Sequence, residues 1–425
     1  MIAKKAINGG RVQPKAGKIQ LAKKTNAPAM NITLHHKISQ YWNATQQELI
    51  PQLKEELGPL TAPLLTLIRT LEVARIEEFV ERRWCGIGRP PKERLALARA
   101  FIAKSVLRLP TTEALRERLQ MDHALKRICG FDMRKMLPDA ATFSRAFAEM
   151  AEGRVGERCH QALIEATLGN QIIGHITRDG TAIEARERPA SHRKPKKAKV
   201  IDLTARPVQT SFIAPTVAPS EQPDAGIAKP PRGRPKKGEI RPAPPVPRLQ
   251  QQRKQTLAQM LDALPRQADR GSKSNAQGYK NSWNGYKLHF DVADGGIPVS
   301  VILTSASVHD SQVAIPLATM TGQRVTNLYD VMDAAYCSDD IREHSIELGH
   351  VPLIDHNPRG GEKRLFDYAE TMRYKIRTQS ERANARLKDE FGADKIFVRG
   401  DQKIMAHLMF GVLALTVDQL LRLIT

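Results

Sequence analysis

The chain has 425 residues, enough for two or three folded units, and 41% of them are apolar, which suffices for a buried core. Its formal net charge is +21, because 66 Lys and Arg oppose 45 Asp and Glu. This composition argues against a membrane protein and a wholly disordered chain, and it favours a basic protein with an anionic partner. We find no secretory-like segment near residue 1 and expect a cytoplasmic location.

The first two predicted segments are a basic tail at residues 1–25, with a charge of +7, and a helical domain at residues 26–168. In the second segment apolar residues recur at helical spacing, as at Leu60, Leu64, Leu67 and Leu71. Its short Arg- and Lys-bearing helices are compatible with a DNA-reading helix-turn-helix. An amphipathic scaffold with solvated arginines explains the same periodicity.

The next predicted element is a strand at residues 171–178, which opens an α/β unit at residues 169–190. The strand leads directly into Asp179, which precedes Gly180. A carboxylate at a strand end is held by the backbone and faces a cleft, so Asp179 is a candidate catalytic residue. A turn or cap residue is the alternative.

Residues 191–280 form a basic insertion with a charge of +13. Twelve of the 27 prolines lie between residues 192 and 250, so we predict a disordered, Pro-rich segment. Basic disordered arms bind polyanions through phosphate contacts and counterion release. A solubilising linker is the alternative.

One motif within this insertion is more specific. Residues 229–237 read Lys-Pro-Pro-Arg-Gly-Arg-Pro-Lys-Lys and resemble an AT-hook. The resemblance implies that Arg232 and Arg234 enter the narrow minor groove of A·T-rich DNA. A chance match within a Pro-rich basic segment is the alternative.

The α/β unit resumes at residues 281–425. Residues 285–292, 298–303, 325–332 and 351–354 read as strands. The third of these ends at Asp333, which repeats the arrangement at Asp179. Asp330 competes with Asp333, but a separation of three residues places the two on opposite faces of a strand. We read the apolar run at 404–417 as a core helix, because it is too short and too polar to span a membrane.

A helix predicted at residues 374–390 carries one polar stripe. The stripe consists of Tyr374, Arg377, Glu381, Asn384 and Lys388, at offsets of 3, 4, 3 and 4 residues. A core-facing stripe would be apolar. Glu381 is therefore a candidate site residue, and a surface salt bridge is the alternative.

Asp179, Asp333 and Glu381 make chemical sense if they converge. Two carboxylates about 4 Å apart repel by about 4 kcal/mol at an effective dielectric near 20, so such a cluster requires cations. Hard oxygen ligands select Mg²⁺ or Mn²⁺, and two such ions can clamp a phosphodiester. Arg377 and Lys388 would then neutralise phosphates, and Tyr374 would stack on a base or sugar.

These residues resemble a known family. Tyr374-x2-Arg377-x3-Glu381-x6-Lys388 is similar to the Tyr-Arg-Glu-Lys signature of bacterial insertion-sequence transposases of the DDE class. Residues 178–184 resemble the family's first-aspartate motif. Residues 333–336, Asp-Ala-Ala-Tyr, resemble its second, which usually has glycine at the third position. Residues 88–147, 285–289, 308–311 and 357–359 are also family-like.

The resemblance implies a ribonuclease H-like catalytic domain, at 169–190 plus 281–425, that binds Mg²⁺ or Mn²⁺ at Asp179, Asp333 and Glu381. It further implies cleavage at terminal inverted repeats, joining of 3′-hydroxyl ends to target DNA, and a dimer or higher oligomer on double-stranded DNA. A metal-dependent nuclease of the same fold and an inactive architectural DNA-binding protein are the alternatives. Accessory roles remain open for four further side chains: Glu184, His289, His309 and Asp310.

Overall fold

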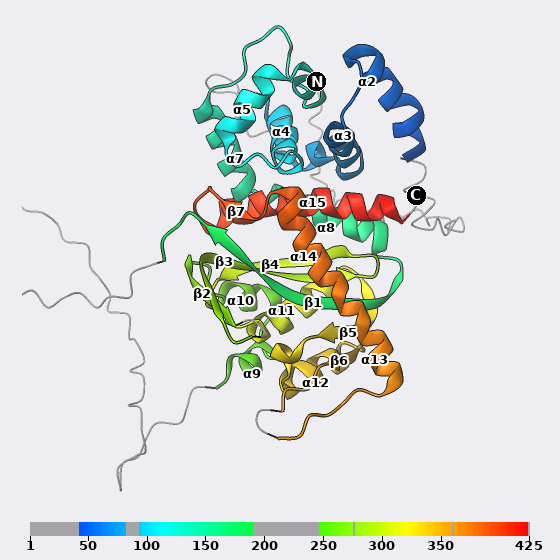
Figure 1. Ribbon diagram of the computed structural model, residues 1–425, viewed down its shortest axis with the longest axis vertical. Coiled ribbons are helices and arrows are strands. Elements are labelled where there is room, and N and C mark those ends of the chain that lie inside the picture. The colour runs from blue at the N-terminus through cyan, green and yellow to red at the C-terminus, as the bar shows by residue number, and fades with distance from the viewer. Residues whose placement is uncertain (1–41, 82–92, 190–245, 275–276, 359–360, 424–425) are drawn as a thin grey trace, which may run out of the picture.

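The computed structural model describes residues 42–81, 93–189, 246–274, 277–358 and 361–423. Residues 1–25 and the AT-hook-like motif with Arg232 and Arg234 lie outside these ranges. A helical region forms one end of the molecule and a mixed sheet with its own helices forms the other (Figure 1). The C-terminal helix lies between the two.

The helical region agrees with the prediction, because within its described residues it contains helices and no strand. Side chains at three helix starts accept hydrogen bonds from backbone N–H groups: Thr111, Asp122 and Asp139. The elements are η1 (Thr45–Leu49), α2 (Ile50–Leu57), α3 (Ala62–Ala74), η2 (Ile76–Phe79), α4 (Arg94–Val106), α5 (Thr112–Met121), α6 (His123–Ile128), α7 (Ala140–Glu152) and α8 (Val155–Leu168).

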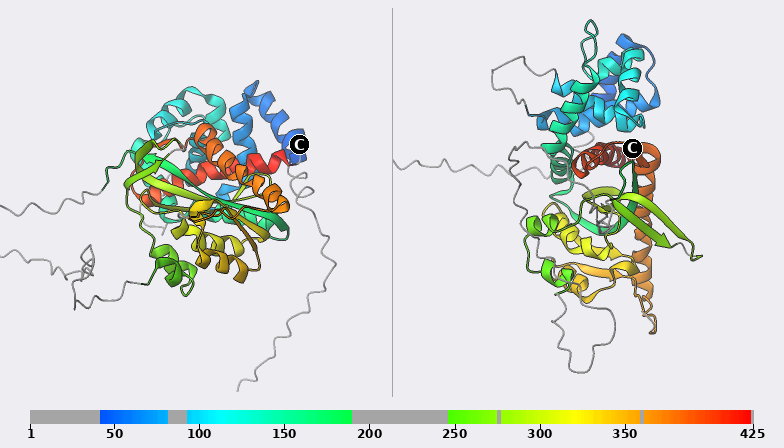
Figure 2. Two further views of the ribbon diagram at one scale, coloured as in Figure 1. Left: turned by 60° about the horizontal axis from the view of Figure 1, so that its bottom comes forward. Right: turned by 90° about the vertical axis from the view of Figure 1, so that its left-hand side faces the viewer.

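The sheet has seven strands in the described residues: β1 (Ile172–Ala185), β2 (Asp269–Ser274), β3 (Lys280–Ala293), β4 (Ile297–Ser305), β5 (Thr326–Met332), β6 (Val351–Ile354) and β7 (Lys395–Ile396). Its order is β2-β3-β1-β5-β6, with β4 also paired to β3 and β7 to β1. Strand β1 is antiparallel to β3 and parallel to β5 and β7. The β2–β3 hairpin projects beyond the rest of the sheet (Figure 2).

The helices after β1 cover the sheet and connect it to the helical region. They are α9 (Arg248–Gln252), α10 (Leu257–Asp262), α11 (Ser311–Gly322), η3 (Ala334–Tyr336), α12 (Asp339–Glu347), α13 (Tyr368–Tyr374), η4 (Lys375–Arg377), α14 (Thr378–Phe391) and α15 (Asp401–Arg422). The single helix predicted at 374–390 corresponds to three successive elements: the last residue of α13, the 3₁₀ turn η4 and α14. The backbone stays in the right-handed helical conformation at both junctions.

We predicted disorder throughout the insertion at 191–280. This prediction is wrong for residues 246–274, which contain α9, α10 and β2. Leu257, Met260, Leu261 and Leu264 have helical spacing, and Met260 and Leu264 are buried in the small clusters beside α11. The charge and proline content of the preceding residues obscured this apolar stripe.

The prediction for β1 is also wrong in length. We expected a strand at 171–178 with Asp179 at its end, but β1 continues to Ala185 and Asp179 lies within it. The reason is that β3 is equally long and pairs with β1 from Ile176 to Glu184. Gly180 therefore does not end the strand.

Helix α15 is the buried centre of the molecule. It packs against α3, α4, α7 and α8 of the helical region and against α14 and β4 of the sheet domain. Our reason for excluding a membrane span is wrong, because the helix is long and apolar enough to cross a membrane by length and composition. The core-helix prediction itself is confirmed, because 83% of its apolar 18-residue window is buried inside the protein. One continuous apolar core consequently runs from the helical region onto the sheet.

Candidate active site

The register of β1 and β5 places Asp179 beside Asp333. Arg178 pairs with Met332 in this parallel ladder, so the two aspartates that follow stand at the same level on neighbouring strands. Neighbouring strands are about 4.8 Å apart. The sheet thus brings together two acids that are remote in sequence.

Asp179 is held by the third predicted element. The Asn384 side chain on α14 donates a 2.9 Å hydrogen bond to Asp179 Oδ2. Burial is the main reason why the pKa of Asp179 rises to about 6, and the negative charges of Asp333 and Asp310 add to the effect. The polar stripe on α14 therefore faces the carboxylates.

Asp333 follows β5 and caps the η3 turn. Its Oδ1 accepts a 2.9 Å hydrogen bond from the backbone N–H of Ala335. Burial raises the pKa of Asp333, and Asp310 raises it further, whereas the Ala335 N–H and Arg377 oppose the shift. Ala335 supplies this donor with its backbone.

Asp310 is a third carboxylate in the same environment. Its Oδ1 lies 3.0 Å from Lys287 Nζ and 3.6 Å from His289 Nδ1. A Cβ added at Gly180 would lie 2.8 Å from Asp310 Oδ1, so Asp310 contacts the strand directly beside Asp179. Of the four side chains with open accessory roles, Asp310 is the one that influences both aspartates.

Glu381 lies on the same helix as Asn384, but it is exposed. Its Oε1 is 2.6 Å from Arg377 Nη2, and half of its side chain is accessible to solvent. In the part of the chain that the structure describes, no group of three His, Cys, Asp or Glu side chains could hold a metal ion as it stands. Glu381 thus occupies the salt bridge that we gave as the alternative.

The remaining predicted side chains surround this group. The Arg377 guanidinium lies 6.0 Å from the Tyr374 ring centre. Burial opposes the shift, but Tyr374, Glu381 and Asp179 together raise the pKa of Arg377. Burial raises the pKa of Tyr374 to about 12. Lys388 is half-buried, and desolvation lowers its pKa despite the nearby charge of Glu184.

Two other acids have structural partners. Asp330 is buried and lies 3.1 Å from His350 Nδ1, on the face of β5 opposite to Asp333. Asp291 forms a buried bidentate ion pair with Arg178 at 2.7 Å.

The two histidines with open accessory roles also have partners. His289 is fully buried against Thr304, whereas His309 is exposed and bonds to Ser311.

The donor set suits a hard divalent cation. Asp179 and Asp333 are adjacent. Burial raises the pKa of both, the charge of Asp310 adds to both shifts, and the charge of Asp333 adds to that of Asp179, a cost that a bound cation would remove. Oxygen ligands of this kind are those of Mg²⁺ and Mn²⁺.

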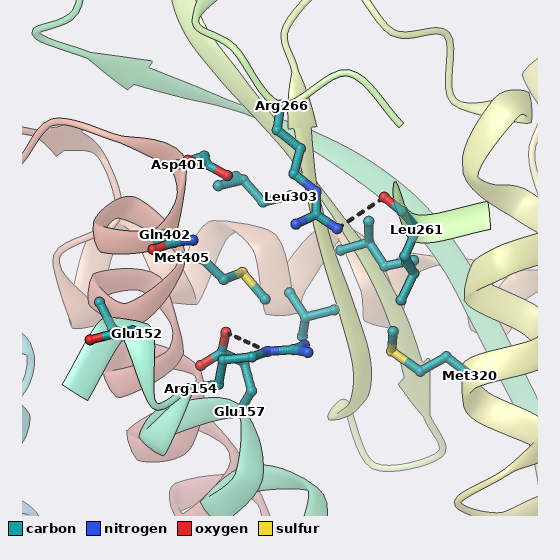
Figure 3. Close-up of a pocket in the computed structure, with 13 residues that line it drawn as sticks. Glu152, Arg154, Glu157, Leu261, Arg266, Leu303, Met320, Asp401, Gln402 and Met405 are labelled. Atoms are coloured by element: carbon teal, nitrogen blue, oxygen red, sulfur yellow. Dashed lines mark hydrogen bonds and ion pairs between the residues drawn. The ribbon is translucent and has the colours of Figure 1, made fainter. Parts of the chain in front are cut away.

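A separate cleft of about 160 Å³ lies between the helical region and β4 (Figure 3). Arg154 and Glu157 line it from the helical side, 3.6 Å apart, and Arg266 lines it from the other side. None of the predicted site residues lines this cleft, so it is distinct from the aspartate pair.

Comparison with protein families matches two parts of the chain. Residues 253–417 match the transposase DDE domain, and residues 51–149 match a second transposase domain, DUF772. The chain belongs to the insertion-sequence transposases of the DDE class. The DDE match includes Asp333 and Glu381 but begins after Asp179. Comparisons with curated proteins and with solved structures give no match.

Membership of this family implies a ribonuclease H-like fold for the sheet domain, and the mixed sheet is consistent with it. It also implies that the transposase binds DNA, and enzymes of this family typically use divalent metal ions. The match from residue 253 agrees with the folded state of α10 and β2 inside the predicted insertion.

Proposed function

We propose that this transposase cleaves phosphodiester bonds at the terminal inverted repeats of its element and joins the 3′-hydroxyl ends to target DNA. The adjacent positions of Asp179 and Asp333, with Asn384 of α14 bonded to the first, carry the proposal. Glu381, three residues before Asn384, completes the acidic set. We place this activity in the bacterial cytosol or nucleoid.

In this proposal Asp179, Asp333 and Glu381 hold two Mg²⁺ or Mn²⁺ ions. When bound, the ions supply a nucleophile at neutral pH and stabilise charge on the leaving oxygen. Asn384 keeps the Asp179 carboxylate oriented, and the Ala335 N–H does the same for Asp333.

Three side chains position the DNA. Release of Glu381 would free the Arg377 guanidinium for a phosphate of the DNA end. Lys388 would contact a further phosphate, and Tyr374 would stack on a base or sugar. The 1–25 tail and the basic part of the 191–280 insertion would add affinity without sequence choice, and Arg232 and Arg234 would enter the minor groove of A·T-rich DNA. A homodimer or higher oligomer would pair two ends.

The first prediction tests the three acids. Asp179→Ala, Asp333→Ala and Glu381→Ala should each lower Mg²⁺-dependent cleavage of a plasmid carrying the element by at least about 1000-fold, with DNA binding retained, because oriented charge is usually the largest catalytic contribution. Glu390→Ala is the matched control, since Glu390 also lies on α14 in an i,i+4 ion pair, with Arg386. Full cleavage by any of the three variants would refute the assignment.

A second reaction separates transposition from its alternatives. A pre-cleaved DNA end with a free 3′-hydroxyl and a target plasmid are incubated with the wild-type chain and Mg²⁺. Joined products indicate a transposase, and cuts without joining indicate a nuclease. DNA binding without either reaction indicates an architectural protein.

A further inference from the structure

Arg178 is buried directly beside the first of the two aspartates. It precedes Asp179 on β1 and is only 2% exposed. Its partner in the parallel ladder with β5 is Met332, which precedes Asp333. Charged side chains are rarely buried to this extent unless they are paired. A buried cation therefore lies in the sheet one residue before the aspartate pair.

The Arg178 guanidinium joins three strands of the sheet. Its Nε and Nη2 donate hydrogen bonds of 2.7 Å to the two carboxylate oxygens of Asp291 on β3. Its Nη1 lies 3.4 Å from Met332 Sδ on β5. Strands β3 and β5 are the two neighbours of β1 at this level, so one side chain contacts both of them.

Asp291 is itself held in place. Its side chain is fully buried, and its Oδ2 accepts a 2.6 Å hydrogen bond from Thr321 Oγ1 on α11. The register of β3 and β4 shifts between Asp291 and Val292. Irregularities of this kind bend a strand and re-aim a side chain, and they are frequent next to active sites. The acceptor of the Arg178 hydrogen bonds is thus fixed by both the sheet and a helix.

The buried ion pair and the aspartate pair lie on opposite faces of the sheet. Successive side chains of a strand alternate between its two faces. Arg178 therefore points to the α11 side, where Thr321 bonds to its partner, and Asp179 points to α14, where Asn384 bonds to it. Any effect of Arg178 on the carboxylates consequently passes through the backbone of β1 and β5.

Stability does not explain this ion pair. Removing two charges from water is unfavourable, and the replacement of a buried ion pair by apolar side chains is often neutral or stabilising. A bidentate contact between arginine and a carboxylate instead fixes both the distance and the angle between the groups that it joins. Here those groups belong to neighbouring strands, at the level where the aspartate pair begins.

We infer that the Arg178–Asp291 pair positions Asp179 and Asp333 by fixing the spacing of β1, β3 and β5 one residue before the two carboxylates. The inference rests on the proposed function for the role of the carboxylates as metal ligands. Arg178 and Asp291 are positioning residues, because they act through the strands. Loss of supporting groups of this kind typically lowers metal affinity by about 10- to 100-fold.

A Mn²⁺ titration of the metal-free full chain, followed by electron paramagnetic resonance, measures this effect without any reaction. Asp179→Ala defines how much of the Mn²⁺ binding belongs to the aspartate pair. Arg178→Met with Asp291→Val removes both buried charges. It should lower the affinity of the aspartate pair for Mn²⁺ at least about 10-fold, while Tm stays near that of wild type or rises. Arg178→Lys keeps the charge but not the planar guanidinium, and it should lower the affinity as well.

Lys104→Met with His407→Leu is the matched control. These two side chains are also buried, 3.4 Å apart, between α4 and α15, and their replacement should not change the affinity for Mn²⁺. An equal loss in this control would overturn the inference, because the loss would then reflect a general loosening of the core.

Wild-type affinity in both Arg178 variants would also overturn the inference, and if the double variant fails to fold, Arg178→Lys decides alone. Failure of the proposed function gives a different result. A wild-type chain that binds Mn²⁺ no better than Asp179→Ala would refute the proposed metal site, and this inference with it, before any Arg178 variant is compared.

Discussion

Gly180 shows how little space surrounds the aspartate pair. A Cβ at this position would lie 2.8 Å from Asp310 Oδ1 and 3.0 Å from Nδ1 of the buried His289. Gly180→Ala should destabilise the fold by about 1 to 3 kcal/mol, as overpacking usually does. Chemical denaturation measures this loss. Asp310→Ala in the same chain should restore part of it, and an unchanged loss would show that Asp310 is not the obstacle.

Asp179 should make stability depend on pH. The pKa of Asp179 is raised from the ordinary 3.8 to about 6, so the folded state binds this proton more tightly than the unfolded state does. The contribution of Asp179 to the free energy of unfolding is therefore present below about pH 4 and is lost as the pH rises through about 6. In metal-free buffer, Asp179→Asn should therefore gain thermal stability relative to wild type at pH 7.5, and gain less at pH 4.5. A difference in Tm that does not vary with pH would contradict the raised pKa.

At the scale of elements, Gly411 lets α15 pack closely against α14. A Cβ at Gly411 would lie 2.9 Å from the backbone oxygen of Phe391 on α14. Gly411→Ala should cost about 1 to 3 kcal/mol in unfolding free energy, although alanine normally favours a helix. Gly322→Ala on α11 is the control, because nothing lies within 4 Å of its added Cβ. It should be neutral or slightly stabilising, and equal effects at both sites would refute the packing argument.

Local patterns predicted five of the seven described strands, α14 and α15, and the exceptions have a physical cause. Strand β6 and the end of β5 follow from runs of apolar residues bounded by polar ones. The length of β1 was not predictable in this way, because β3 extends it through pairing with a distant segment. The polar stripe from Tyr374 to Lys388 identified the face of α14 toward Asp179. It gave no sign of the Arg377–Glu381 ion pair, which is a choice of side-chain rotamer.

For the whole molecule, the insertion and the folded core can be separated at residue 245. Deleting residues 191–245 should leave the fold intact. It should also weaken the salt dependence of DNA binding, because each lost phosphate contact lowers the slope of log K against log salt concentration by about 0.9. Deleting residues 191–280 should in addition lower Tm, because Met260 and Leu264 leave the core beside α11. Thermal unfolding and a salt titration measure the two effects. Equal Tm values for both deletions would contradict the packing of α10.

The most direct test of the account is a crystal structure of the chain with Mn²⁺ and a DNA end. The anomalous signal of manganese should place ions between Asp179 and Asp333, with the Glu381 carboxylate turned away from Arg377 to join them. Manganese bound elsewhere, with Glu381 still paired to Arg377 in the presence of DNA, would contradict the proposed catalytic site.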